Sequence, residues 1–339
     1  MDFARQEMRR TILDPRAGFA PVESVSEVRW DPLTGHTARV LRDRVPLVPT
    51  VDGEPAQLAA QTRLGCPFCP ERVREVTPCF PPALVEQGRI DVGAAVLFPN
   101  LVGYAEHSSV CVYSPELHHL PLAAMTSALV ADNLAAQVEF CRAVQHPGRP
   151  APRLGSGWAS LNANHMLPAG SSLYHPHTQG AVDSVPSNEQ RLLAEVPAAR
   201  FRDYLDAERQ DGRRYLGGSP DVEWLAAFAP RGPGELRAFV WPAGNPADLD
   251  RPLVDELGSG IATAMNFYAE LGYSSCNWAL YGAPVDRVGY PLNLRMVLRS
   301  NVAPLYRSDV TWLERLHHEL ATDVLPEDLG ERAGDRFRR

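Results

Sequence analysis

Two histidines separated by one residue, His175 and His177, are the strongest candidates for chemistry in this sequence. They follow a loop of small residues at 169–172 and precede an amide side chain, Gln179. In an extended segment, side chains two positions apart leave the backbone on the same face. One imidazole can then be held as a metal ligand while the other attacks the α-phosphorus of a nucleoside diphosphate compound. The pattern therefore predicts phosphate chemistry, although a lone His-x-His is also typical of an exposed loop.

The residues around the histidines are suited to binding phosphate. Gln179 can donate a hydrogen bond to a non-bridging phosphate oxygen and stabilise charge as it develops. Backbone amides of Gly170, Ser171 and Ser172 can surround the same phosphate groups, because small residues allow close approach of the main chain. We therefore expect the loop and the strand after it to form one anion-binding site.

A second pair of candidate ligands, Cys66 and Cys69, lies far upstream in a Cys-x-x-Cys spacing. Such a pair is typical of a zinc site, and also occurs in redox sites or without a role. The sequence contains no second pair of this kind, so the remaining ligands should be histidines, from among His118, His119 and His175. A Cys₂His₂ set would form a closed site of structural type, in which the metal acts as a clamp. For either member of the His118–His119 pair, a polar turn is the other interpretation.

Charge and composition exclude several classes of protein. The 339 residues include 33 basic and 41 acidic side chains, a net charge of −8, which is unlike the basic footprint of a nucleic-acid binder. No apolar run reaches the roughly 18 residues of a membrane span, and the N-terminus lacks the apolar core of a signal peptide. Six cysteines are too few for a disulfide framework at this length. We expect a cytoplasmic protein without a membrane or nucleic-acid partner.

Hydrophobic periodicity predicts an α+β fold built twice. Helices are expected at 125–145, capped by Thr126, at 252–271 and at 310–321. Strands are expected at 94–98, 109–113, 158–162, 237–241, 276–281 and 293–299. The order strand, strand, helix, strand recurs, so each half should be an antiparallel sheet with helices packed on one face. We divide the chain into an arm at 1–25, a catalytic half at 26–190 and a second half at 191–339.

Taken together, the motifs resemble the galactose-1-phosphate uridylyltransferase family of the histidine-triad superfamily, which includes the ADP-glucose phosphorylase-like enzymes. The resemblance covers nearly the whole chain in a consistent order. It rests on segments 29–35, 66–70, 98–100 and 113–115, and on Asn164, Gly170, Ser172, His175, Pro176, His177 and Gln179 at their full spacing.

The resemblance implies two histidine-triad-like halves, a homodimer, and a ping-pong exchange between a nucleotide sugar and a sugar phosphate. His177 would be the nucleophile that forms a covalent nucleotidyl-histidine. Zinc would be bound by Cys66, Cys69, His175 and one of His118 or His119. The other carried-over roles are phosphate binding by Gln179, Ser172 and Arg44, and contacts to nucleotide and loop by Asn100 and Asn164.

The sequence departs from the family pattern at three places. The histidine after Ser114-Pro115 comes one residue late, since Glu116 and Leu117 precede His118, which leaves His118 and His119 as alternatives for the third ligand. Thr178 stands where the uridylyltransferases usually have glycine, and we expect it to reshape the pocket. The second half lacks a His-x-His motif at 292–298, so its own metal site and some contacts to the acceptor sugar are not expected. The nucleobase and the sugar are left open. Phosphorolysis or hydrolysis of a nucleotide sugar, or zinc-stabilised nucleotide binding without turnover, are the alternatives.

Overall fold

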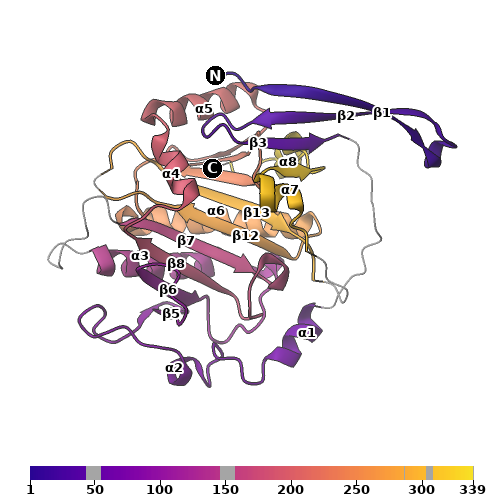
Figure 1. Cartoon of the computed structure of the whole chain (residues 1–339). Helices are drawn as coiled ribbons and strands as arrows, with labels where there is room; N and C mark the ends of the chain where they lie inside the picture. Colours follow the sequence, from indigo (N-terminus) through magenta and orange to yellow (C-terminus); the bar gives the residue numbers. More distant parts are fainter. Residues whose placement is uncertain (43–54, 146–156, 286, 303–307, 339) are drawn as a thin grey trace.

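The computed structural model describes residues 1–42, 55–145, 157–285, 287–302 and 308–338, which form a ten-stranded and a four-stranded sheet with surrounding helices (Figure 1). The large sheet contains β4 (Ile90–Val92), β5 (Ala95–Pro99), β6 (His107–Val112), β7 (Trp158–His165), β8 (His177–Asp183), β9 (Tyr215–Gly218), β10 (Val222–Ala226), β11 (Leu236–Val240), β12 (Ser275–Tyr281) and β13 (Leu292–Arg299). The helices are α1 (Pro55–Thr62), α2 (Val73–Val76), α3 (Ser127–Gln145), α4 (Asn188–Glu195), α5 (Ala198–Asp211), α6 (Arg251–Glu270), α7 (Trp312–His317) and α8 (Pro326–Ala333). The predicted α+β class is confirmed.

The large sheet is an internal repeat joined at its middle. Its strand order is β4-β5-β6-β8-β7 in the first half, continued by β12-β13-β11-β10-β9 in the second. Each half runs outward from its central strand in the same order, with one long helix between its third and fourth strands. The two halves join where β7 pairs with β12, antiparallel, so that Asn162 lies opposite Ala279. The sequence predicts two sheets, whereas the structure fuses them into one.

The long helices α3 and α6 cover one face of this sheet and pack against each other. The hydroxyl of Thr126 accepts a hydrogen bond from the Leu129 amide, which confirms the predicted cap of α3. The two helices approach closely at Gly258, where an added Cβ would lie 3.0 Å from the backbone nitrogen of Ala131. None of the helices in the described ranges has the length and apolarity needed to cross a membrane.

The four-stranded sheet consists of β1 (Arg5–Asp14), β2 (Ala20–Trp30), β3 (Thr37–Leu41) and β14 (Leu320–Thr322). Strands β1 and β2 form a long antiparallel hairpin that projects from the body of the molecule (Figure 1). The arm expected at residues 1–25 has the structure of a β-hairpin, and residue 25 lies inside β2. Nearly all side chains of β1 are exposed, so this strand gives no apolar period in the sequence.

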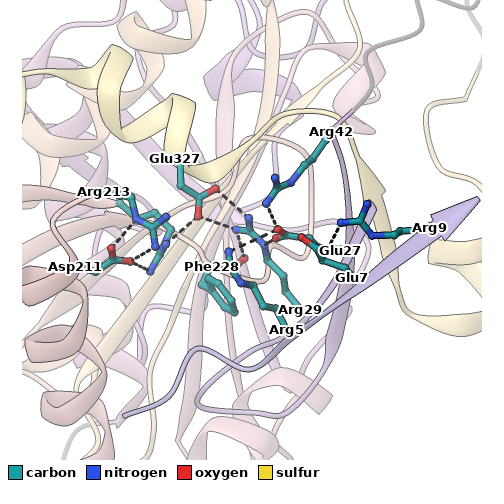
Figure 2. A network of polar contacts seen from close by, with 11 residues as sticks. Arg5, Glu7, Arg9, Glu27, Arg29, Arg42, Asp211, Arg213, Phe228 and Glu327 are labelled. Atoms are coloured by element: carbon teal, nitrogen blue, oxygen red, sulfur yellow. Dashed lines mark hydrogen bonds and ion pairs between the residues drawn. The ribbon is translucent and has the colours of Figure 1, made fainter. Parts of the chain in front are cut away.

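Buried charges fasten the small sheet to the rest of the chain (Figure 2). From β2, the guanidinium of Arg29 donates to both carboxylate oxygens of Glu327 on α8, at 2.9 and 3.1 Å. Arg214 donates to the same carboxylate at 2.8 Å, and Glu27 accepts from Arg29 at 2.8 Å. Burial alone would raise the pKa of Glu327, but Arg29 and Arg214 outweigh it and the pKa lies below its ordinary value.

The C-terminal region differs from the prediction of one helix at 310–321. Helix α7 ends at His317, because His318 adopts a left-handed conformation with φ of 55°. The chain then enters β14, which pairs in parallel with β3. Pairing with a strand from the N-terminus is a long-range contact that local periodicity cannot reveal.

Candidate active site

Four side chains predicted as metal ligands converge beside the start of β8. One ligand atom from each of Cys66, Cys69, His118 and His175 lies within 4.8 Å of the other three, and all four residues are buried. The Nδ1 atom of His175 lies 3.7 Å from both sulfur atoms, and the Nδ1 atom of His118 lies 3.4 Å from that of Cys69. Three separate segments therefore supply one cluster.

Backbone carbonyls fix which ring nitrogens face the cluster. The Nε2 atom of His175 lies 3.0 Å from the carbonyl oxygen of Ser114, and that of His118 lies 3.0 Å from the carbonyl oxygen of Ala59. A carbonyl oxygen only accepts hydrogen bonds, so each neutral ring carries its hydrogen on Nε2. Both Nδ1 lone pairs then point at the thiols, which is the arrangement that orients histidine ligands of metals.

The separations in the cluster fit a tetrahedral metal ion. With zinc–sulfur bonds of about 2.3 Å and zinc–nitrogen bonds of about 2.0–2.1 Å, the sulfur–nitrogen edge of a tetrahedron is about 3.6 Å. Burial and the neighbouring Cys66 raise the pKa of the Cys69 thiol to about 11, so without a cation Cys69 keeps its proton. A divalent cation would displace this proton, because the thiolate is the form that binds metal. The four residues can therefore hold a metal ion.

His177 is the first residue of β8, and its side chain lies on the face of the sheet opposite α3. Its Nδ1 atom donates a hydrogen bond to the carbonyl oxygen of His175, at 2.9 Å. This bond leaves the lone pair on Nε2. Burial lowers the pKa of His177 below its ordinary value, so the ring is neutral near pH 7. The ring of Phe68 meets it edge to face, with centroids 5.2 Å apart. His177, two residues after His175, is thus a neutral and oriented imidazole that can act as a base or a nucleophile.

Thr178 points away from His177, which corrects the expectation that it reshapes the pocket. Its fully buried side chain faces α3, where its hydroxyl donates to Asn133 at 2.6 Å and accepts from Gln137 at 3.0 Å. The cause is the alternation of side chains along a strand, which places neighbours on opposite faces. Thr178 therefore fastens the strand that carries His177 to the helix beneath it.

Gln179 returns to the face of His177, as the two-residue spacing predicts. Its backbone pairs with Asn162 on β7, and the Asn162 amide donates to the Gln179 carbonyl oxygen at 3.3 Å. The side chain is half-buried, so its amide can reach a group bound above the sheet.

The small-residue loop is held by residues of the second half. Asn277 on β12 donates to the side chain of Asn164 at 2.7 Å and to the carbonyl oxygen of Ala169 at 2.8 Å. Arg299 on β13 donates to Asn277 at 2.6 Å. The loop turns at Gly170, whose φ of 94° is in the left-handed region that favours glycine. Asn277 therefore links Asn164 to the loop, and the contact of Asn164 with a nucleotide stays a prediction.

The two serines of the loop differ in exposure. The Ser171 hydroxyl donates to the carbonyl oxygen of Leu173 at 2.7 Å and is used inside the loop. Ser172 is exposed. Of the two hydroxyls, that of Ser172 is thus placed to meet a ligand, while Ser171 and Gly170 can offer only backbone groups.

Three remaining candidates lie apart from this cluster or outside the described residues. Asn100 follows β5, and its side chain accepts from the Val102 amide at 3.1 Å in an exposed loop. His119 is not among the four clustered ligands, and its Nε2 atom is buried without a hydrogen-bond partner in the described part of the chain. Arg44 lies outside the described residues, so its predicted phosphate contact stays a prediction.

Sequence reasoning missed Asn277, Arg299, Asn133 and Gln137. The last two are polar residues on the apolar stripe of α3, and both are fully buried. A buried amide on a helix face requires a partner, and this was a usable signal. Asn277 and Arg299 carry no such signal, because their partners come from elements more than 100 residues away or across a strand pair.

Comparisons with known proteins agree with this fold. No family model matches the chain. A protein of Archaeoglobus fulgidus, described only as uncharacterized, is 30% identical over 343 residues, covering 97% of this chain and 96% of its own.

Solved structures of low sequence identity have the same fold. An ADP-glucose phosphorylase from Arabidopsis thaliana with bound ADP-glucose has a TM-score of 0.65 at 17% identity, covering 91% of this chain and 98% of its own. A uridylyltransferase has a TM-score of 0.57 at 18% identity, with the same coverage. The chain therefore belongs to one family with the Archaeoglobus protein, and it has the fold of the galactose-1-phosphate uridylyltransferase-like proteins.

Proposed function

We propose that this protein is a nucleotidyltransferase that moves a nucleotidyl group from a nucleoside diphosphate sugar to a sugar 1-phosphate. The observation that carries the proposal is the hydrogen bond from Nδ1 of His177 to the carbonyl oxygen of His175. It holds a neutral imidazole with its Nε2 lone pair available, next to a residue anchored in a Cys₂His₂ cluster. The likeness in fold to an ADP-glucose phosphorylase and a uridylyltransferase supports the same class of reaction.

The reaction proceeds in two balanced displacements at phosphorus. In the first, Nε2 of His177 forms a bond to the α-phosphorus, and the bond to the bridging oxygen breaks, releasing the sugar 1-phosphate. In the second, a phosphate oxygen of another sugar 1-phosphate attacks the same phosphorus, and the phosphorus–nitrogen bond breaks. The Gln179 amide and the backbone amides of 170–172 stabilise the charge on the non-bridging oxygens.

Zinc at Cys66, Cys69, His118 and His175 completes the proposal. All four positions of a tetrahedral ion would be filled by protein, so the metal would supply rigidity instead of a site for substrate. The metal would affect the reaction by fixing the positions of residues next to its ligands. With the Nδ1 atom of His175 bound to the ion, the carbonyl oxygen of the same residue is fixed, and with it the ring of His177.

Turnover with purified substrates tests the proposal. We expect exchange of the nucleotidyl group when ADP-glucose, UDP-glucose or a GDP-sugar is mixed with a different sugar 1-phosphate. His177→Ala should lower kcat by roughly 10³-fold or more, as loss of a nucleophile does in other enzymes. The exposed Cys79→Ser variant is the control for handling and folding.

The identity of the acceptor is tested in the same assay. A reaction that needs only inorganic phosphate would reassign the chain to a nucleotide-sugar phosphorylase. A reaction in buffer alone would make it a hydrolase. Binding without products in any mixture would contradict catalysis and leave a nucleotide-binding protein.

A further inference from the structure

The small-residue loop at 169–172 is connected to an arginine of the second half by two asparagines in series. Arg299, the last residue of β13, donates a hydrogen bond to the side-chain oxygen of Asn277, at 2.6 Å. The side-chain nitrogen of Asn277 donates to the side-chain oxygen of Asn164 at 2.7 Å and to the carbonyl oxygen of Ala169 at 2.8 Å. Both hydrogens of this amide group are therefore used.

A carboxylate holds Arg299 in place. The Nε and Nη2 atoms of Arg299 donate to the two carboxylate oxygens of Asp309, at 2.9 and 2.5 Å. The backbone amide of Ser300 donates to the same carboxylate at 2.9 Å. Burial alone would raise the pKa of Asp309, but Arg299 and the Ser300 amide outweigh it, so the pKa lies below its ordinary value. Two parallel bonds to a charged carboxylate thus fix the direction in which the Nη1 atom of Arg299 points.

The charge of Arg299 determines how both asparagine amides are turned. A guanidinium group can only donate hydrogen bonds, so the oxygen of the Asn277 amide must face it. The nitrogen of Asn277 then faces Asn164, whose own oxygen must face Asn277. Turning Asn277 over would place its N–H groups against the guanidinium and lose a charge-assisted bond, which is about twice as strong as a neutral one.

The nitrogen of the Asn164 amide is consequently directed at the loop. A Cβ added at Gly170 would lie 3.8 Å from this nitrogen, which makes no hydrogen bond within the described ranges. Asn164, Asn277 and Arg295 line a cavity of about 410 Å³ where the two halves meet, and Arg299 is not among the described residues that line it. The wall beside the loop therefore presents a hydrogen-bond donor, which is the group that a phosphate oxygen can accept from.

We propose that Arg299, held by Asp309, is a positioning residue of the phosphate site, which acts through Asn277 and Asn164 to present an amide N–H beside Gly170. The proposal rests on the proposed function for the presence of phosphate groups at this loop. Arg299 acts without touching the substrate, because its charge sets the direction of two successive hydrogen bonds. The opposite direction would present the oxygen of Asn164 and repel a phosphate oxygen.

A double-mutant cycle on ligand affinity tests this chain of hydrogen bonds without depending on turnover. In the His177→Ala background, titration calorimetry measures the affinities for ADP and UDP, and the tighter of the two is the probe. Arg299→Met should weaken its binding roughly 10-fold, the equivalent of about one hydrogen bond. Asn164→Ala should cause a similar loss. Arg299→Met added to Asn164→Ala should cost less than about twofold more, because the donor that Arg299 orients is already absent.

A second variant and a control accompany this cycle. Asp309→Asn keeps the guanidinium group and removes the charge that holds it, so we expect a smaller loss, of roughly threefold, that also disappears in the Asn164→Ala background. Arg191→Met removes an arginine that is likewise paired with a carboxylate, but on the exposed surface of α4, and should leave the affinity within about twofold. Denaturant unfolding establishes that each variant is folded.

The outcomes separate this proposal from the proposed function. If Arg299→Met costs as much affinity in the Asn164→Ala background as in its absence, the proposal is overturned, because a structural or long-range electrostatic role does not require Asn164. Unchanged affinity in Arg299→Met overturns it as well. The expected coupling in a chain whose His177 never becomes nucleotidylated would support the positioning role and contradict only the proposed transferase. Nucleotidylation of His177 without the coupling would do the reverse.

Discussion

Strands β8 and β13 occupy corresponding places in the two halves of the large sheet, yet their side chains contact the helices in different ways. On β8, Thr178 makes hydrogen bonds to Asn133 and Gln137 of α3. On β13, the side chains on the helix side are apolar and fully buried: Leu292, Leu294, Met296 and Leu298. Its hydrogen bond to α6 goes to the backbone, from the Tyr268 hydroxyl to the carbonyl oxygen of Met296, at 3.0 Å. Apolar packing fixes a strand by shape, whereas hydrogen bonds also fix direction and register.

The faces of the two strands that point away from the helices also carry different residues. On β8 that face carries His177 and Gln179, and on β13 it carries Asn293 and Arg295. A reacting atom must be held to within a fraction of an ångström, which directional bonds achieve better than packing. A wall that only lines a cavity tolerates more movement. The duplicated frame thus supports a precise strand in one half and a cavity wall in the other.

Removing one ligand of the Cys₂His₂ cluster should have the largest effect. Among the described residues, only the first half of the chain contains such a cluster. Cys66→Ser should abolish stoichiometric zinc and lower the free energy of unfolding by roughly 5 kcal/mol or more, since structural zinc contributes folding free energy directly. Metal analysis and denaturant unfolding measure the two effects. Cys79→Ser should change neither. Full zinc content in Cys66→Ser would show that the four residues do not form the site.

Shortening an apolar side chain on β13 should have the next largest effect on stability. Leu294→Ala removes a fully buried side chain and should cost about 2–5 kcal/mol in unfolding free energy. The rate of nucleotidyl transfer by the folded protein should fall by less than about threefold, because the cavity left behind lies under the second half, away from His177. Denaturant unfolding measures the change in stability, and single-turnover kinetics measures the change in the rate of nucleotidyl transfer. A large loss of rate with intact folding would mean that β13 positions the reacting groups as well.

Thr178→Val should affect the rate more and the stability less than Leu294→Ala does. The stability cost should be smaller, about 1–3 kcal/mol, because Asn133 and Gln137 each lose a buried partner. The rate should fall further than in Leu294→Ala, since β8 loses its directional attachment next to His177. Thr178→Ser keeps the hydroxyl and should restore the rate. Failure of serine to restore it would assign the effect to the lost methyl group and its packing.

The sequence was sufficient for much of the fold and for the metal cluster. Amphipathic spacing predicted α3 and α6, and recurring strand order predicted the repeat. Residue type and spacing singled out Cys66 and Cys69 and left three histidine candidates, His118, His119 and His175. The structure brings His118 and His175 to the two cysteines. The fusion of the two sheets and the pairing of β14 with β3 depend on contacts between distant segments.

Two features of the site could not be predicted from residue type and spacing. The role of Thr178 depends on which face of β8 it occupies, and a family comparison at that position misled because it ignored the alternation. Asn277 holds the loop at 169–172 from the other half of the chain, and nothing local distinguishes it from other strand asparagines. Directional contacts across the repeat are visible only once the strands are paired.

The most direct test of the account is the intact mass of the protein after mixing with ADP-glucose, UDP-glucose or a GDP-sugar in the absence of acceptor. We predict the addition of one nucleotidyl group, located at His177, that disappears when a sugar 1-phosphate is added. The addition should be absent in His177→Ala and present, though slower to form, in Thr178→Val. An adduct of the same mass and yield in His177→Ala would contradict the assignment of the nucleophile.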